Sequence, residues 1–503
     1  MQDTALKIFS EIAQVPRPSG REEKIIAWLE AFAAKHNFNY KKDAAGNVLM
    51  QVPATAGYEK CPPVCLQSHV DMVCEKRPGL EHDFDNDPIR LKTEGDLLKA
   101  EGTTLGADNG IGMAMALAAA VSPECKHPPL ELLFTVNEET GLVGASLLEP
   151  EFFQAKTLIN LDEETEGTFV IGCAGGEDIN ISLHNLKRSP VTGYGRLINC
   201  RFSVTSLLGG HSGIDINKKG RANANTLAGR LLYSIWLKVP GMWLISVNGG
   251  ASRNAIARDC VCEFLVPAKP KPLKPQTSGD LTFSPDYSAR GTLEPLFAEL
   301  KHQIEREYPS ENLTGLKLEL CDAPDDTAAL SEADTRRIVG LLRAMPNGVY
   351  SYSPELGTVE TSNNLGTVSL SRSDSVFTLG SLQRSSDPKR LDDIRDKILA
   401  IGELCGGSIK CSGRYASWTP AKESALLTRC IEVYKKHTGN EPRVKVIHAG
   451  LECGAIGSRM GGLDMISFGP DISSPHSPDE NVSISSVKRI REFLFVLLES
   501  FTE

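Results

Sequence analysis

The residues best suited to chemistry are acids and histidines that follow apolar, strand-like runs. The run at 64–68 leads into His69 and Asp71, which are two positions apart. Side chains at i and i+2 of an extended segment point to the same side, so an imidazole and a carboxylate meet there. One use of such a pair is a metal-bound histidine whose second ring nitrogen is held by the carboxylate. The other interpretation is a solvated His and Asp in a loop.

Further acids and a second histidine occupy comparable places. Apolar runs at 130–136 and 157–161 lead into acidic residues, and a run at 463–468 leads into a histidine-bearing loop. The candidates are His69, Asp71, Asp108, Glu138, Glu139, Asp162 and His476. Two imidazoles and three carboxylates can hold two divalent ions about 3.5–4 Å apart, as in two-metal hydrolases. Ligands of this kind, without thiolates, suit zinc, manganese or cobalt.

Several of these acids also have an ordinary structural interpretation. Asp108 could cap a helix that begins near residue 111, because Asp is favoured at helix N-caps. Glu138 and Glu139 could belong to a solvated turn, and Asp162 could be one member of an acidic cluster. The glycine-rich segment 102–112 lacks the spacing of a phosphate-binding loop, and no GxSxG elbow is present. The metal interpretation therefore depends on the acids and histidines acting together.

The elements that must position these residues form two patterns. Strand-like and helical segments alternate at both ends of the chain, which predicts an α/β layer with ligands at the carboxyl ends of strands. The middle of the chain has an α+β pattern. We predict a discontinuous catalytic domain, residues 1–191 and 415–503, with a mixed, largely parallel sheet flanked by helices. An inserted α+β lid domain is predicted at 192–414, and the Pro/Lys-rich stretch 267–275 predicts an exposed loop.

Composition narrows the class of protein. At 503 residues the chain is longer than one core usually supports. A net charge of −10 with scattered acids does not fit a nucleic-acid binder or a partner of anionic membranes. No signal peptide and no apolar run of about 18 residues is apparent. The 13 irregularly spaced cysteines are typical of reduced thiols, and we expect a cytoplasmic protein.

A set of separated motifs resembles a known family. The motifs are His69-Val-Asp71, Gly106-Ala-Asp-Asn-Gly110, Glu138-Glu139, Asp162 and Pro475-His476-Ser-Pro-Asp-Glu480. Together they resemble the signature of co-catalytic zinc peptidases, a group that includes aminoacylases and succinyl-diaminopimelate desuccinylases. Further motifs resemble the bacterial aminoacyl-histidine dipeptidases, also called cytosol non-specific dipeptidases. These are Gly172-Cys-Ala-Gly-Gly176, Gly209-Gly-His-Ser-Gly213, Arg253-Asn-Ala-Ile256 and His448-Ala-Gly-Leu-Glu-Cys-Gly454.

The resemblance implies a role for each candidate. It implies five metal ligands in two sets that share one bridging carboxylate: His69 and Asp162 on one ion, Glu139 and His476 on the other, and Asp108 on both. Asp71 would orient the His69 ring from behind. Glu138 would be the general base that takes a proton from the attacking water and passes it to the leaving amine. His211 would stabilise the oxyanion, from its own chain or from a partner subunit.

Substrate-binding residues are less closely defined. Arg384 is the candidate for gripping the substrate carboxylate through a bidentate fork, with Asn254 assisting. Arg372 and Arg253 compete with Arg384 for that role. Glu452 could meet the substrate ammonium group or could be a buried structural carboxylate.

The function predicted is a metal-dependent hydrolase of unblocked dipeptides, including those that end in histidine. Its cofactors would be two divalent ions, zinc first and manganese or cobalt as alternatives. The partners predicted are a dipeptide substrate, no nucleic acid and no membrane, and a homodimer is left open. An N-acyl amino acid deacylase or desuccinylase with the same two-metal site is the alternative, and a binding protein without catalysis is a third interpretation.

Overall fold

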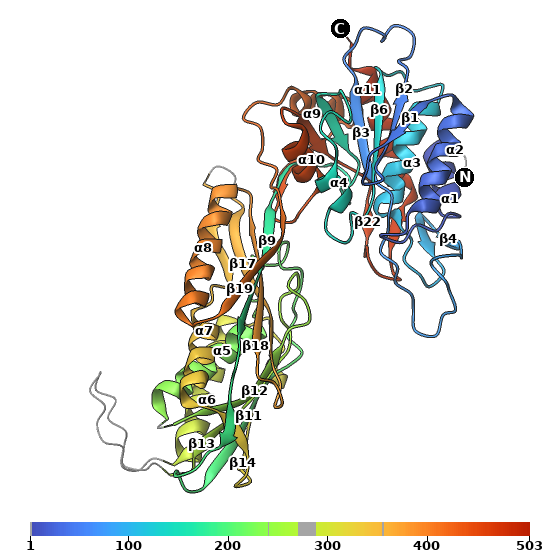
Figure 1. The fold of residues 1–503 in the computed structure, drawn as a ribbon. Coiled ribbons are helices and arrows are strands. Elements are labelled where there is room, and N and C mark those ends of the chain that lie inside the picture. The colour runs from blue at the N-terminus through green and yellow to red at the C-terminus, as the bar shows by residue number, and fades with distance from the viewer. Residues whose placement is uncertain (1–2, 240, 270–287, 355–356, 503) are drawn as a thin grey trace. The chain divides into compact units, whose positions relative to one another are not determined.

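The computed structural model describes residues 3–239, 241–269, 288–354 and 357–502 (Figure 1). It divides into two compact units. The first comprises Met1–Ala174 and Tyr415–Glu503, and the second comprises Gly175–Arg414. Most of the Pro/Lys-rich loop predicted at 267–275 falls outside the described residues.

The first unit is built on an eight-stranded mixed sheet. Its order is β1-β2-β6-β3-β7-β21-β8-β20. The strands are β1 (Asn39–Lys42), β2 (Val48–Val52), β3 (Val64–His69), β6 (Leu130–Thr135), β7 (Thr157–Asn160), β8 (Thr168–Cys173), β20 (Arg443–Ile447) and β21 (Asp464–Ser467). β3 is parallel to both β6 and β7, so the carboxyl ends of these three central strands lie at one edge. The α/β fold class predicted from the sequence is confirmed.

Helices supply apolar side chains to both faces of this sheet. They are α1 (Thr4–Ile12), α2 (Glu23–His36), α3 (Ala107–Val121), α4 (Val143–Leu147), α9 (Ala425–Thr438), α10 (Glu452–Met460) and α11 (Ile484–Glu499). Val48 and Met50 of β2 pack in the core that contains α1, α2, α3, α9 and α11, whereas Leu49 packs in the core that contains α4 and α10. Because alternate residues are buried on opposite faces, the strands read as continuous apolar runs.

A small sheet in the same unit carries the late histidine. Its order is β22-β23-β5-β4, with β4 (Leu91–Glu94), β5 (Leu97–Ala100), β22 (Ile472–Ser473) and β23 (Asn481–Ser483). β22 and β23 are antiparallel, so residues 474–480 form the connection of a hairpin, and His476 lies in that connection. In the described parts of the chain, no helix combines the length and the apolar character needed to cross a bilayer.

The second unit is an antiparallel sheet with helices on one face. The order is β14-β11-β13-β12-β17-β18-β9-β19, with β16 added beside β17. The strands are β9 (Gly175–Leu183), β11 (Leu197–Val204), β12 (Trp243–Gly249), β13 (Cys260–Pro267), β14 (Lys317–Asp322), β16 (Gly348–Tyr352), β17 (Val359–Leu370), β18 (Phe377–Ser385) and β19 (Ser408–Tyr415). The helices α5 (Ala224–Lys238), α6 (Ala289–Glu307), α7 (Glu332–Ala344) and α8 (Pro388–Leu404) follow this sheet along one side (Figure 1).

This sheet contains the same topology twice. The elements β11-α5-β12-β13-α6-β14 and β9-α7-β17-β18-α8-β19 each run β-α-β-β-α-β, and both place their four strands in the order 4-1-3-2. The two halves meet where β12 pairs antiparallel with β17. The first half is inserted between β9 and α7 of the second. The second unit therefore contains a topological repeat.

The boundary of the second unit differs from the predicted one. The sequence placed the insert from residue 192, whereas the unit begins at Gly175. The reason is β9, which pairs with β18 along nine consecutive residue pairs, from Phe377 opposite Leu183 to Ser385 opposite Gly175. A strand held along its whole length by one sheet belongs to that sheet. The second unit ends at Arg414, and the first unit resumes at Tyr415, which is where the insert was predicted to end.

Candidate metal centre

Three predicted ligands converge where β3 and β7 end and α3 begins. His69 is the last residue of β3, and its Nε2 lies 3.0 Å from Oδ1 of Asp108 and 3.5 Å from Oδ1 of Asp162. The ligand atoms of these three side chains lie within 4.8 Å of one another. His69 is fully buried, and the side chains of Asp108 and Asp162 are only 13% and 9% exposed. The group is therefore a closed cluster of one nitrogen and two oxygen donors.

A second group shares Asp108 with the first. Nε2 of His476 lies 3.1 Å from Oδ2 of Asp108 and 3.1 Å from Oε2 of Glu139. Asp108 therefore turns one oxygen toward His69 and the other toward His476. This is the placement expected of a carboxylate that bridges two ions. His448, which directly follows β20, is absent from the groups of described residues that could hold a metal.

The donor atoms are spaced as metal ligands would be. Ligands about 2.0–2.1 Å from a tetrahedral zinc ion lie about 3.3 Å from one another. The four distances between ligand atoms here run from 3.0 to 3.5 Å. Oε1 of Glu139 is buried and has no hydrogen-bond partner among the described residues. The residues therefore fit a pair of divalent cations.

The electrostatics of the cluster point the same way. Hydrogen bonds to Asp108 and Glu139 raise the pKa of His476 to about 11. Burial raises the pKa of Asp162 well above its usual range, and the negative charges of Asp108 and Glu138 add to that effect. The raised pKa values of His476 and Asp162 favour the protonated form of each side chain, which offsets the negative charge of the neighbouring carboxylates. Divalent ions would take over that role and release the protons.

Asp71 holds the histidine and the glutamates in one arrangement. Its Oδ1 lies 3.4 Å from Nδ1 of His69 and accepts the backbone N–H of Glu138 at 3.0 Å. Its Oδ2 accepts the backbone N–H of Glu139 at 3.2 Å and the hydroxyl of Ser19 at 2.8 Å. The Asp71 carboxylate therefore orients the ring of His69 and fixes the backbone of Glu138 and Glu139.

Glu138 belongs to neither of the two groups that share Asp108, but it forms a third group of possible metal-holding residues with His69 and Glu139. Its carboxylate lies within 4.8 Å of ligand atoms of both His69 and Glu139. Burial raises the pKa of Glu138 well above its ordinary value, and the nearby Glu139, Glu452 and Asp108 carboxylates raise it further. A carboxyl group with raised basicity next to the ligands can accept a proton from a water molecule bound there.

The turn before Asp108 is shaped around a buried arginine that the sequence analysis missed. Arg17 is 2% exposed and donates from Nη1 to the carbonyl oxygens of Val70 and Asp71, each at 2.9 Å. Its Nη2 donates to the carbonyl of Gly106. Gly106 has a φ of 68°, and a Cβ there would lie 2.5 Å from Nη2 of Arg17. Glycine at this position therefore admits the guanidinium that joins the end of β3 to the Asp108 turn.

A second side chain without an assigned role is Glu480, in the motif that contains His476. It is 2% exposed, and its carboxylate accepts backbone N–H groups at the beginning of α3. Sequence reasoning missed Arg17 and Glu480 because neither is part of a periodic apolar pattern and neither is spaced from other residues as metal ligands are. The only available signal was the position of Arg17 between two prolines and of Glu480 close to a candidate ligand.

Glu452 begins α10 and lies in a buried polar network. Its Oε2 accepts hydrogen bonds from Nε2 of Gln67 at 2.6 Å and from the hydroxyl of Thr135 at 2.7 Å. The residue is 0% exposed, and burial raises its pKa to about 7. These contacts favour the buried structural carboxylate that the sequence left open beside the substrate-binding role. Gln67 and Thr135 belong to β3 and β6, so Glu452 joins α10 to the strands that lead to the cluster.

The second unit brings together the other three predicted residues. Nη2 of Arg384, on β18, lies 3.4 Å from Nε2 of His211. Nδ1 of His211 accepts the backbone N–H groups of Gly213 and Ile214, each at 3.2 Å. Asn254 adjoins them, since its carbonyl accepts the N–H of Ser212 at 2.8 Å.

The competing arginines have other partners. Arg253 donates from Nη2 to Oδ1 of Asn180 at 2.8 Å, and Arg372 donates from Nη2 to Glu263 at 2.6 Å. Arg384 is 5% exposed and lies beside His211, whereas Arg253 and Arg372 pair with other side chains.

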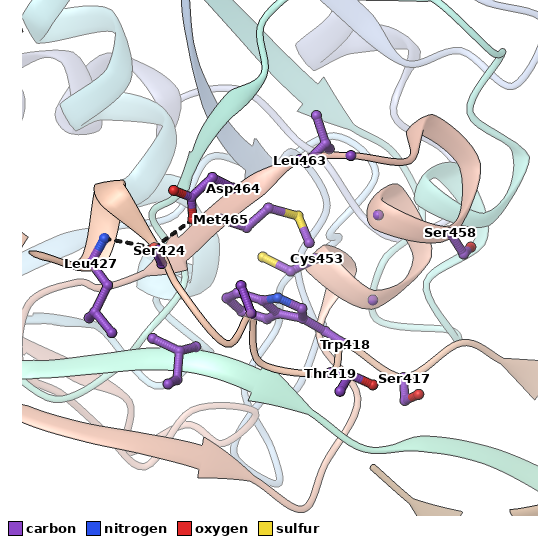
Figure 2. A pocket seen from close by; sticks show the side chains of 15 residues that line it. Ser417, Trp418, Thr419, Ser424, Leu427, Cys453, Ser458, Leu463, Asp464 and Met465 are labelled. Carbon is purple, nitrogen blue, oxygen red and sulfur yellow. Dashed lines mark hydrogen bonds between the residues drawn. The ribbon is translucent and has the colours of Figure 1, made fainter. Parts of the chain in front are cut away.

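A separate pocket of about 260 Å³ lies in the first unit (Figure 2). It is bordered by α10, β21 and the segment around Trp418, and the sulfur atoms of Cys453 and Met465 point into it. Ser424 and Asp464 are hydrogen-bonded at its side, at 2.6 Å. None of its described lining residues is a predicted site residue, so the pocket is distinct from the cluster of acids and histidines.

Comparisons with known proteins assign the chain to a peptidase family. The model of peptidase family M20/M25/M40 matches residues 65–500. The chain is 37% identical over 494 residues to the cytosol non-specific dipeptidase of Escherichia coli strain K12, which covers 98% of this chain and 96% of that protein. The crystal structure of aminoacylhistidine dipeptidase from Vibrio alginolyticus superimposes with a TM-score of 0.83 at 35% identity, covering 99% and 96% of the two chains. The aminopeptidase PepT of Bacillus cereus shares the fold, with a TM-score of 0.55 at 15% identity over 100% and 99%.

Proposed function

The chain belongs to peptidase family M20/M25/M40, and on that basis we propose that it is a metal-dependent dipeptidase acting on unblocked dipeptides, including those that end in histidine. The observation that carries the proposal is the sharing of Asp108 between two groups of ligand atoms, each with one histidine and one further acid. Two dipeptidases are similar to this chain over nearly its whole length.

Five residues would hold the ions. The two sets are His69 with Asp162 and His476 with Glu139, and Asp108 contributes one oxygen to each. When bound, two such ions polarise the peptide carbonyl and lower the pKa of a water molecule toward about 7. Zinc suits this set of nitrogen and oxygen donors best, with manganese or cobalt as alternatives.

Glu138 would move the proton. Its carboxylate would take a proton from the attacking water and deliver it to the nitrogen of the leaving amino acid. Asp71 supports this role because it accepts the Glu138 N–H and so fixes where the backbone of the base lies. Asp71 also fixes the ring of His69, whose Nε2 faces the cluster. The base and its neighbouring ligand are thereby held by one carboxylate.

The His211 region of the second unit would recognise the substrate. Nε2–H of His211 would donate to the oxyanion of the tetrahedral intermediate. The guanidinium of Arg384 would bind the substrate carboxylate through two N–H groups, with Asn254 beside it. His211 would act in its own chain or, in a homodimer, on the partner's site. The similarity to a cytosol non-specific dipeptidase supports a cytoplasmic location.

The test combines metal analysis with a small substrate panel. The chain should bind two divalent ions, lose activity with a chelator and regain it with zinc, manganese or cobalt. It should hydrolyse a free dipeptide and leave the N-acetylated dipeptide intact. The reverse preference would identify a deacylase, and full metal content without hydrolysis of either compound would identify a binding protein.

A variant pair tests the assignment of base and ligand. Glu138→Gln should keep both ions and lower turnover by about 10²–10⁴-fold, the usual contribution of general base catalysis. Glu139→Gln is the matched control, because it should weaken the binding of one ion. If E138Q loses an ion and E139Q keeps both, the two roles are reversed.

A further inference from the structure

One buried carboxylate ties the loop that carries His476 to the turn that carries Asp108. Glu480 accepts four consecutive backbone N–H groups through its two oxygens. The donors are Leu105 at 2.7 Å, Gly106 at 2.9 Å, Ala107 at 2.8 Å and Asp108 at 3.3 Å. These N–H groups belong to the turn before the regular part of α3, because Asp108 and Asn109 have non-helical backbone angles. Hydrogen bonds from backbone N–H groups to an ionised carboxylate are stronger than those between neutral groups. Glu480 thus fastens its own loop to the start of α3.

The two halves of the metal centre differ in how they are held. His69 ends β3 and Asp162 follows β7, and these strands pair with each other inside the buried sheet. His476 instead lies in the hairpin connection 474–480, has a φ of 59°, and has a side chain that is 51% exposed. The strands themselves position the first half, whereas a loop positions the histidine of the second.

The other side-chain contacts of this loop are exposed or local. Asp479 pairs with Arg77 at 2.6 Å, but both side chains are more than half exposed. The hydroxyl of Ser477 donates to the carbonyl of Ser474 within the same loop, at 2.9 Å. Surface ion pairs contribute little to a fixed geometry. In the described part of the chain, Glu480 therefore provides a buried link between this loop and the Asp108 turn.

We propose that Glu480 is a positioning residue for the second metal ion. It holds the His476 loop and the Asp108 turn at one spacing, so that His476, Asp108 and Glu139 can meet around a single cation. The carboxylate acts through backbone N–H groups and is not among the ligand atoms. The inference depends on the two-ion centre put forward above.

Arg17 holds the same turn from its carbonyl side. Gly106 donates its N–H to Glu480 at 2.9 Å, and its carbonyl accepts from Arg17. Burial lowers the pKa of the Arg17 guanidinium, and the charge of Glu480 opposes that effect. The positive and negative charges are thus buried on opposite sides of one peptide segment. Loss of the negative charge of Glu480 should therefore loosen the contact between this peptide segment and the loop that carries His476.

The experiment titrates metal-free protein with Zn²⁺ by calorimetry and with Co²⁺ by visible absorption. Glu480→Gln keeps the size of the side chain but turns an NH₂ group toward N–H donors. Wild type should bind two ions. E480Q should bind one of the two ions about 10–100-fold less tightly, the usual cost of losing a partner behind the ligands, and the other ion within about threefold of wild type. Asp479→Asn is the matched control, one residue away and exposed, and should bind both ions as wild type does.

The outcomes separate this inference from the proposed function. If wild type binds fewer than two ions, the two-ion centre itself fails. If wild type binds two and E480Q binds both with wild-type affinity, only the role of Glu480 is refuted. An E480Q chain that loses both ions equally, or loses its folded circular dichroism spectrum, also overturns the proposal, because Glu480 would then support the whole unit.

Discussion

Asp71 offers a test in which stability and metal binding are both set by one side chain. The residue is 0% exposed, and each of its carboxylate oxygens meets two partners. Oδ1 faces His69 and the N–H of Glu138, and Oδ2 faces the N–H of Glu139 and the hydroxyl of Ser19. In Asp71→Asn, either orientation of the amide places an NH₂ group against a buried backbone N–H. The substitution keeps the shape and removes the charge.

The magnitude follows from these contacts. Burial would raise the pKa of Asp71, but the hydrogen bonds from His69, Glu138 and Ser19 lower it from 3.8 to about 2. A difference of that size corresponds to about 2 kcal/mol of favourable interaction with the ionised carboxylate. A buried N–H left without an acceptor costs about 1–3 kcal/mol. The two figures describe overlapping interactions, so we expect metal-free D71N to be about 2–3 kcal/mol less stable than wild type at pH 7.

The pH dependence has a definite sign. Because the pKa is lower in the folded state, the stabilisation is present above about pH 4 and is lost as the pH falls toward about 2. Urea unfolding of metal-free protein measures the free energy, and the wild-type advantage over D71N should shrink below about pH 4. Zinc affinity should fall by about 10–100-fold. Asp85→Asn, which alters an exposed carboxylate paired with Arg21, is the control.

Two results would refute this reasoning. Equal free energies of unfolding for D71N and wild type at pH 7 would mean that the four contacts of Asp71 add nothing to the fold. A zinc affinity for D71N equal to that of wild type would mean that the ring of His69 is oriented without its carboxylate. Either result would remove Asp71 from the positioning of the metal centre.

Three further predictions concern other parts of the molecule. Gly106→Ala should lower the free energy of unfolding by about 2–4 kcal/mol, because its Cβ would meet the Arg17 guanidinium in a backbone with positive φ; a urea midpoint equal to that of wild type would contradict this. Burial raises the pKa of Glu164 to about 8, and hydrogen bonds to acids raise that of His476 to about 11, so the folded metal-free chain binds extra protons. Its melting temperature in chelator should therefore fall as the pH rises from about 5 to about 9, and bound divalent ions should remove most of that trend. Arg384→Lys should lower kcat/KM for dipeptides by about 10–100-fold, chiefly through KM, because a point charge replaces a two-pronged contact; a loss in kcat alone would argue against carboxylate binding.

The sequence was informative wherever the chemistry lies at the end of a regular element. His69, Glu139 and Asp162 follow buried apolar runs, and the carboxyl ends of neighbouring parallel strands meet at one edge of a sheet. Strand periodicity is a local property, so a single chain displays it. The α/β class and the interrupted order of the two units could be predicted for the same reason. The loop after the apolar run 463–468 made His476 a candidate, and the family resemblance then implied that it is a ligand.

Tertiary structure alone decided what holds those residues in place. Arg17 binds carbonyl groups 53, 54 and 89 positions away, and Glu480 binds N–H groups 372–375 positions away. Every residue but proline carries the same backbone N–H and carbonyl groups, so such partners leave no pattern in the sequence. The assignment of β9 to the second unit has the same origin, because its partner strand lies about two hundred positions later. The local sequence pattern showed which side chains could bind metal or transfer a proton. Long-range hydrogen bonds to the backbone determined where those side chains lie.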